Sequence, residues 1–168
     1  MNASGQHCIV VDTNVLAVAE GLHVDATEQC RAACVDIARR IKEGLTVVVD
    51  ADGLIVAEYV QALAKSHTAG VGTKLARVLR RQQNDSAKCC KVKLTPSDEP
   101  PGSFEEVPQS LRDFDVDDHK FIGVAAVGGS QIYQAVDREW WGRRHDFAAC
   151  GVDVQFLCAT YLMDVSPG

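Results

Sequence analysis

The chain has 168 residues, of which 46 % are hydrophobic and 24 % charged, and its formal net charge is −6. This length and balance fit one ordinary domain with a full core, and no stretch approaches the roughly 20 consecutive apolar residues of a membrane span. The negative net charge, taken alone, argues against a protein that binds nucleic acid through overall charge.

The first third of the chain alternates short apolar strands with helices. Residues 8–11 predict a buried strand that ends in an aspartate. Residues 25–43 predict a helix, because their apolar positions follow helical spacing, Asp25 can cap the start and Gly44 stops the end. The β-branched run 45–49 predicts a second strand.

Two helices are expected in the middle of the chain. Asp50 or Asp52 caps the first of them, and Gly70 and Gly72 break it. Residues 73–84 predict the second helix, which is basic and presents several cations on one face.

The last part of the chain begins with a proline-rich stretch at 85–109, which predicts a loop or a mobile insertion. A helix is expected to open at Asp118 and to end at two glycines. Residues 130–137 predict a strand that again runs into an aspartate, 138–149 another helix, and 152–157 a last strand.

This alternation predicts an α/β fold, a three-layer α/β/α sandwich around a mainly parallel sheet. We expect a single domain over 1–168, with the basic helix and proline-rich insertion at about 66–114. Charge is segregated along that insertion, since residues 65–93 are basic and 98–118 acidic.

The N-terminal residues and the seven cysteines indicate in which cellular compartment the protein is expected. Residues 1–7 lack the basic start and apolar centre of a signal peptide, so we expect a soluble, cytoplasmic protein without membrane contacts. The odd number of cysteines then favours reduced thiols, and the absence of a CxxC pair argues against a tetrahedral zinc site. Small buried hydrophobic side chains are the simpler role for Cys8, Cys34, Cys150 and Cys158.

Four acidic residues follow buried strands or lie on helices that lead to one edge of the sheet. Open parallel sheets bind ligands at the carboxyl ends of their strands, so side chains placed there can converge. Converging carboxylates repel one another unless they share a cation, and carboxylates with water are the ligands of Mg²⁺ or Mn²⁺. Each residue also has a simple structural role as a helix cap, a turn residue or a solvated helix position. The four residues are Asp12, Glu58, Asp118 and Asp137.

The segments IVVDTNVL, LIVAEYVQAL, DHKFIGVAA and IYQAVDREW occur in this order and resemble the PIN-domain nucleases. The resemblance covers roughly residues 8–65 and 115–158. It implies that Asp12, Glu58, Asp118 and Asp137 form an acidic quartet, with Thr13 and Asn14 as a supporting polar pair.

Two features differ from the family pattern. The family often has threonine two residues before its last acid, where this chain has Ala135, and Glu139 can share or replace the role of Asp137. Asp115 and Asp117 crowd the third acid, although the segment DHKFIGVA favours Asp118.

The resemblance implies a metal-dependent endoribonuclease that leaves 5′-phosphate and 3′-hydroxyl ends. Mg²⁺ or Mn²⁺ would activate water and shield the scissile phosphate, with Asp12 and Asp118 as direct ligands. Glu58 and Asp137 would complete the site directly or through water, and one or two ions remain possible.

Single-stranded or looped RNA is the expected substrate, because the cleavage site must be accessible. Cations near the acids would contact the RNA phosphates, or else lie on solvated helix faces. Trp140 and Trp141 can stack on unpaired bases, although core packing suits at least one of them, and His119 is expected to be a bystander. The candidate phosphate contacts are Lys74, Arg77, Arg80, Arg81, Lys120 and Arg138.

Other functions stay open. A haloacid-dehalogenase phosphatase would need a second aspartate where Asn14 stands, and a receiver domain using Asp50 lacks its partner acids and late lysine. A PIN-like binding module with a degenerate site would bind nucleic acid or protein without cutting. A toxin nuclease would share the chemistry and add an antitoxin, and another protein partner or a homodimer is also compatible with the sequence.

Overall fold

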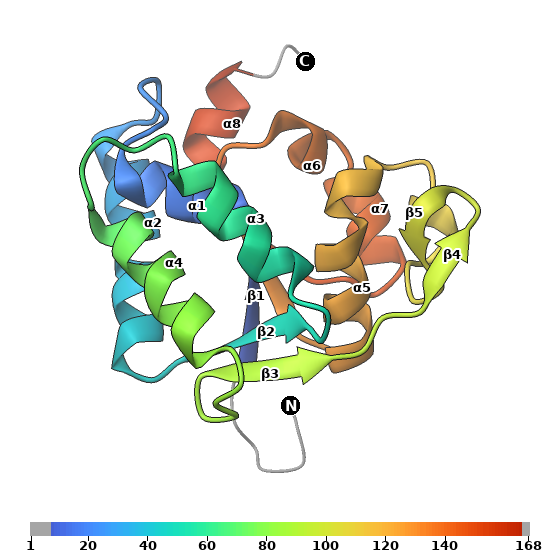
Figure 1. Cartoon of the computed structure of the whole chain (residues 1–168). Coiled ribbons are helices and arrows are strands. Elements are labelled where there is room, and N and C mark those ends of the chain that lie inside the picture. The colour runs from blue at the N-terminus through green and yellow to red at the C-terminus, as the bar shows by residue number, and fades with distance from the viewer. Residues whose placement is uncertain (1–7, 166–168) are drawn as a thin grey trace.

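The computed structural model describes residues 8–165, so the N-terminal segment considered for a signal peptide lies outside the described residues. Its centre is a five-stranded sheet in the order β3-β2-β1-β6-β7, and every neighbouring pair is parallel (Figure 1). The strands of this sheet are β1 Cys8–Val11, β2 Thr46–Asp50, β3 Cys89–Val92, β6 Gln131–Gln134 and β7 Val154–Phe156. Helices flank the sheet, which confirms the predicted three-layer α/β/α fold.

The helices follow the strands in the order expected for such a fold. They are α1 Thr13–Glu20, α2 Glu28–Glu43, α3 Leu54–Leu63, α4 Val71–Gln82, α5 His119–Gly128, α6 Arg138–Gly142, α7 Arg144–Ala149 and α8 Ala159–Val165. Helix α5 packs across β1, β2, β3 and β6, whereas α1 and α3 contact β6 and β2 and pack against α4. Among residues 8–165, no helix has both the length and the apolar character to cross a membrane.

The two central strands are apolar because both of their faces are covered. Every residue of β1 and β2 is buried, and parallel sheets under two helix layers need such continuous apolar runs. The predicted strands at 8–11 and 45–49 are therefore confirmed, the second one shifted by one residue.

The start of α2 differs from the prediction, whereas at the start of α3 Asp50, one of the two predicted caps, binds the first N–H groups. Helix α2 begins at Glu28 rather than at Asp25, because Thr27 is the cap and its Oγ1 accepts from the Cys30 N–H at 3.1 Å. Asp50 covers the start of α3, since its two carboxylate oxygens accept from the N–H groups of Leu54 and Ile55 at 2.9 and 2.8 Å.

The stretch at 85–109 is structured, so its prediction as a loop is wrong. It contains the edge strand β3 and an antiparallel hairpin of β4 Pro96–Asp98 and β5 Pro101–Phe104, followed by the 3₁₀ turns η1 Gln109–Leu111 and η2 Val116–Asp118. The helix predicted at 138–149 is two short helices, which meet at Arg143 directly after Gly142, a residue of low helix propensity.

The cysteines differ from the prediction of reduced thiols. Cys30 and Cys158 form a disulfide, so Cys158 is buried but is not a free hydrophobic thiol. Cys8 and Cys34 are buried as expected, whereas Cys150 is half-buried. Burial raises the pKa of Cys34 to about 12, which keeps this side chain a neutral thiol.

Gly72 lies inside α4 rather than breaking a helix, and it allows α4 to approach α1 closely. A Cβ atom at this position would lie 2.2 Å from the carbonyl oxygen of Leu16, far inside contact distance. We expect Gly72→Ala to lower the free energy of unfolding by about 1–3 kcal/mol, because the two helices must move apart. Urea denaturation of the wild type and the variant measures this difference.

Gly142→Ala is the matched control for this substitution. No heavy atom outside its own neighbours lies within 4 Å of a Cβ built there, so this alanine should leave stability unchanged or raise it slightly. Equal effects of the two alanines would show that the contact between α1 and α4 does not depend on Gly72.

Candidate functional site

Two of the predicted acids lie at the carboxyl ends of the neighbouring strands β1 and β6. Asp12 caps α1: its backbone N–H continues the sheet by donating to the Tyr133 carbonyl at 2.9 Å, and its Oδ1 accepts from the Asn14 N–H at 2.8 Å. Asp137 caps α6 through the N–H groups of Glu139 and Trp140. Asp12 therefore has the cap role considered from the sequence, and Asp137, which was considered as a turn residue, also caps a helix. Both lie at the edge of the sheet where a ligand would bind.

Glu58 reaches the same edge from α3. Next to it, the Tyr59 hydroxyl donates to the Val11 carbonyl at 2.5 Å and ties α3 to the end of β1. The Glu58 carboxylate accepts from Thr13 Oγ1 at 2.5 Å and pairs with the Lys120 ammonium at 2.5 Å. Thr13 thus supports the second acid, and Lys120 contacts that acid rather than solvent alone.

Asp118 stands at the junction of η2 and α5, and its side chain does not cap the helix. Its Oδ2 instead accepts from the Trp140 Nε1–H at 2.9 Å. Trp140 is fully buried, stacked on Phe147 with 4.7 Å between ring centroids, and in edge contact with Phe114. Trp140 is therefore a core residue that holds Asp118, and it is not available to stack on a base.

The four acids interact electrostatically. Burial raises the pKa of Asp12 well above its usual value, and repulsion from Asp118, Glu58 and Asp137 raises it further, against the lowering by the Asn14 N–H. Burial also raises the pKa of Asp118 to about 7; the Trp140 bond lowers it, and Asp137 raises it. Among the charges that raise the pKa of Asp12, Asp118 contributes most, which favours it over Asp115 and Asp117 as the third acid.

Asp12 is buried, with only 5 % of its surface exposed. Among residues 8–165, no lysine or arginine forms an ion pair with it. Within that part of the chain, Cys30, Cys34 and Cys158 are the only three acidic, histidine or cysteine side chains whose ligand atoms lie within 4.8 Å of one another. A cation shared by all four acids would thus be held partly through water, as is common for Mg²⁺.

The predicted supporting residues have defined contacts. Asn14 Oδ1 accepts from the Ala135 N–H at 3.0 Å and so links α1 to the end of β6. Ala135 lacks the hydroxyl group of the threonine that the family often has here, but its backbone N–H binds Asn14. Glu139 is largely exposed. Partial loss of solvent around its carboxylate, together with repulsion from Asp115 and Asp137, raises its pKa.

A groove lies beside Glu58 and Asp118, between α3 and the β4–β5 hairpin. Its volume is about 580 Å³, and Gln61, Phe104 and Lys120 contribute to its walls. We call it the α3–hairpin groove. Its full lining is Leu54, Ala57, Glu58, Gln61, Gly102, Phe104, Val116, Asp117, Asp118 and Lys120.

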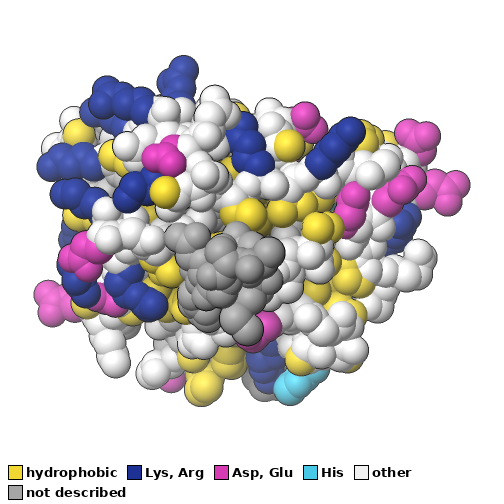
Figure 2. Space-filling model, turned by 90° about the horizontal axis from the view of Figure 1, so that it is seen from below, with side chains coloured by type: hydrophobic (Ala, Val, Ile, Leu, Met, Phe, Trp, Pro, Cys, Tyr) yellow, Lys and Arg dark blue, Asp and Glu magenta, His cyan; other side chains and the backbone are white. Residues whose placement is uncertain are grey.

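The basic side chains of α4 lie on the other side of α3. Figure 2 shows Lys and Arg gathered on the side of α2 and α4 and a group of Asp and Glu on the side of the hairpin. Arg80 lines a hollow that shares Ala57 and Gln61 with the α3–hairpin groove, whereas the hollows of Lys74 and Arg77 share no residue with that groove. Lys74 instead lines a hollow against α2, and Arg77 one beside His67.

The remaining residues considered from the sequence are exposed or make contacts with residues other than the four acids. Arg81 and Arg138 are exposed. His119 is fully buried, with its ring nitrogens 2.7 Å from Ser103 Oγ and 3.1 Å from the Phe114 carbonyl, as a bystander to the acids would be. Trp141 has its edge contact with Phe156, and the Arg144 guanidinium lies over its ring at 4.5 Å.

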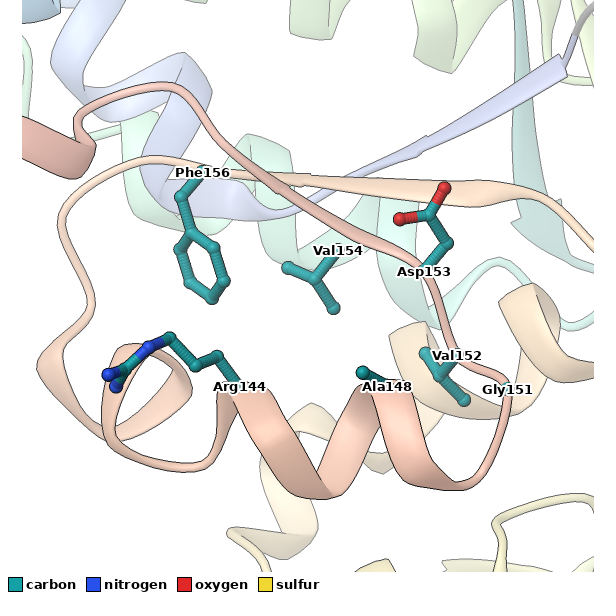
Figure 3. Close-up of a pocket in the computed structure, with 7 residues that line it drawn as sticks. All are labelled: Arg144, Ala148, Gly151, Val152, Asp153, Val154 and Phe156. Carbon is teal, nitrogen blue, oxygen red and sulfur yellow. The ribbon is translucent and has the colours of Figure 1, made fainter.

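Another hollow, of about 460 Å³, lies between α7 and β7 (Figure 3). Arg144 and Asp153 lie at its opposite ends, with Val154 and Phe156 pointing into the space between them. None of the predicted acids lines it. It is therefore separate from the candidate site.

No protein-family model, curated protein or solved structure matches the chain. The chemistry of the candidate site is accordingly inferred from its own residues.

Proposed function

We propose that the protein is a metal-dependent endoribonuclease of the PIN-domain type, which hydrolyses phosphodiester bonds of single-stranded or looped RNA. The observation that supports this most is the environment of Asp12. An ionised carboxylate that is buried beside three acidic neighbours, with no cationic partner among residues 8–165, is costly, and a cation bound nearby would relieve that cost.

Asp12 and its three acidic neighbours would offer carboxylate oxygens to such a cation. Asp12 and Asp118 would hold Mg²⁺ or Mn²⁺, with Glu58 and Asp137 contributing directly or through water. The bound ion would shield the charge of the scissile phosphate and lower the pKa of a water molecule. The chain keeps these acids in place through Asn14, Tyr59 and Trp140, whose bonds fix Asp12, α3 and Asp118 respectively.

The α3–hairpin groove would give the RNA a path to Glu58 and Asp118, the two of the four acids that line it. Lys120 lies in it and supplies positive charge beside Glu58 and Asp118. A single strand can enter such a groove, whereas a duplex presents its phosphates on a wide and rigid surface.

A mixed-sequence RNA labelled at one end tests this proposal. Cleavage is expected with Mg²⁺ or Mn²⁺, and EDTA should abolish it until excess metal is added back. Absence of cleavage, together with absence of Mg²⁺ or Mn²⁺ binding by calorimetry, would contradict the proposal.

One observation favours a second function, a binding module that does not cut. Lys120 already neutralises Glu58, as a lysine can do in a site that has lost its metal. RNA binding without cleavage, unaffected by Mg²⁺, would support this alternative.

The position of Arg80 predicts which cation of α4 contacts RNA. Arg80→Ala should weaken RNA binding and reduce the slope of log affinity against log salt by about one unit, because one phosphate contact is lost. Fluorescence anisotropy over a salt series measures both effects. Lys74→Ala is the matched control, since Lys74 faces α2, and equal losses in the two variants would contradict the assigned path.

A further inference from the structure

Three cysteines form a cluster that the proposed nuclease site does not use. Cys30 and Cys34 lie one turn apart on α2, and Cys158 directly precedes α8. Their sulfur atoms all lie within 4.8 Å of one another, and the three residues are 3 %, 0 % and 4 % exposed. The cluster therefore joins α2 to the start of α8 in a place without solvent access.

We propose that reduction of the Cys30–Cys158 disulfide turns this cluster into a binding site for one thiophilic metal ion, such as Zn²⁺, held by Cys30, Cys34 and Cys158. This inference does not depend on the proposed nuclease function.

The spacing of the sulfur atoms fits this role. In a tetrahedral site, Zn–S bonds of about 2.3 Å place two thiolates roughly 3.8 Å apart. The three sulfur atoms, which lie within 4.8 Å of one another, would therefore need only small shifts to share one ion. Cys30 and Cys34 share a face of a regular helix, which places both sulfur atoms on the same side. The Leu162 N–H donates to the Cys158 carbonyl at 3.0 Å, so Cys158 is also held by the first turn of α8.

The redox state would decide which bond joins α2 to α8. Reduction breaks the S–S bond and takes two electrons and two protons, which a thiol or phosphine reductant supplies as it becomes a disulfide or, with the oxygen of water, a phosphine oxide. The metal ion then replaces the protons of the thiols that it binds. In the oxidised protein only Cys34 keeps a thiol in this cluster, and one buried thiol does not make a metal site.

Cd²⁺ is the probe for the experiment, because its bonds to thiolate sulfur give a charge-transfer absorption band. The full chain is reduced with a phosphine, freed of excess reductant under argon and titrated with Cd²⁺ and then with Zn²⁺. Thiol counting after denaturation should give five thiols in the oxidised protein and seven after reduction. We expect one thiolate-bound Cd²⁺ per reduced chain, competition by Zn²⁺, and a higher melting temperature with the metal present.

Cys34→Ser separates this site from the disulfide. The variant can still form the Cys30–Cys158 bond, which checks that it folds, but its reduced form should bind the metal at least about a hundredfold more weakly. Cys150→Ser is the matched control, because this half-buried thiol lies outside the cluster, and it should bind like the wild type. Equal metal binding by reduced Cys34→Ser and wild type, or no thiolate band in a protein with seven counted thiols, would overturn the proposal.

Discussion

Replacing Asp12 by asparagine is expected to lower RNA cleavage about a thousandfold while raising the melting temperature of the metal-free protein. Loss of a metal ligand removes several kcal/mol of charge stabilisation, and each 1.4 kcal/mol is about a factor of ten in rate. The stability gain has the opposite cause. Asparagine carries no charge among Asp118, Glu58 and Asp137, and its side-chain oxygen can still accept from the Asn14 N–H.

Metal ions should distinguish the two proteins further. Mg²⁺ or Mn²⁺ should raise the melting temperature of the wild type and leave that of Asp12→Asn unchanged, because only the wild type binds the ion in its folded state. Asp36→Asn is the control, since Asp36 lies exposed on α2 beside Arg39, where a surface ion pair contributes about 0–1 kcal/mol. An Asp12→Asn protein that is folded and cleaves RNA at the wild-type rate would exclude catalysis at this carboxylate.

The second large effect concerns Glu20, which is buried at the end of α1. Its carboxylate accepts from Ser66 Oγ at 2.6 Å and from the N–H groups of Gly70 and Thr73 at 2.9 Å each, and so ties α1 to the start of α4. Glu20→Gln turns one acceptor oxygen into an NH₂ group that faces these donors. We expect unfolding free energy to fall by about 3 kcal/mol, as for a buried donor left without its charged acceptor.

The effect of Glu20 should depend on pH. Burial alone raises the pKa of Glu20, but the bonds from Ser66, Thr73 and Gly70 outweigh it and lower the pKa below 4.5. Its stabilisation is therefore present above pH 4.5 and is lost as the pH falls below that value through the pKa of the folded state. Urea denaturation at neutral pH and in steps below pH 4.5 should show the difference between wild type and Glu20→Gln narrowing.

Glu43→Gln is the matched control, because Glu43 is exposed and pairs only with Arg39 on the same helix. It should change stability by a few tenths of a kcal/mol at most. A difference between wild type and Glu20→Gln that stays constant down the pH series would mean that the Glu20 carboxylate is not bound as described.

The fold could be predicted where the pattern of apolar residues in a segment is compatible with only one type of secondary structure. The runs that became β1 and β2 read as buried strands because both faces of a central parallel strand are covered. The edge strand β3 was missed because Lys91 interrupts its short apolar run and proline-rich sequence follows it. The cap of α2 was assigned to Asp25 because Asp25 and Thr27 are both good caps and local sequence does not rank them.

The site could be predicted only as a set of positions. Strand ends placed Asp12 and Asp137 at one edge of the sheet. Asp118 was added because it stands at a helix start, Glu58 because it lies within an otherwise apolar helix, and the PIN-domain resemblance joined the four. The contacts that hold these acids come from tertiary packing: Lys120 pairs with Glu58 across 62 positions of the chain, and Trp140 bonds Asp118 across 22. The Cys30–Cys158 disulfide was missed for the same reason, since the two residues are 128 positions apart.

The β5 strand has the α3–hairpin groove on one side and the buried His119 on the other, and this limits how the groove can evolve. Gly102 and Phe104 line the α3–hairpin groove, while Ser103 between them bonds the buried His119. Gly102 has a φ of 86°, which disfavours other residues, and Phe104 is part of the core. Single substitutions in β5 should therefore destabilise the fold. Changes in the shape of the groove are expected instead from replacement of the whole hairpin, or from substitutions at the exposed Leu54 and Gln61 on the opposite wall.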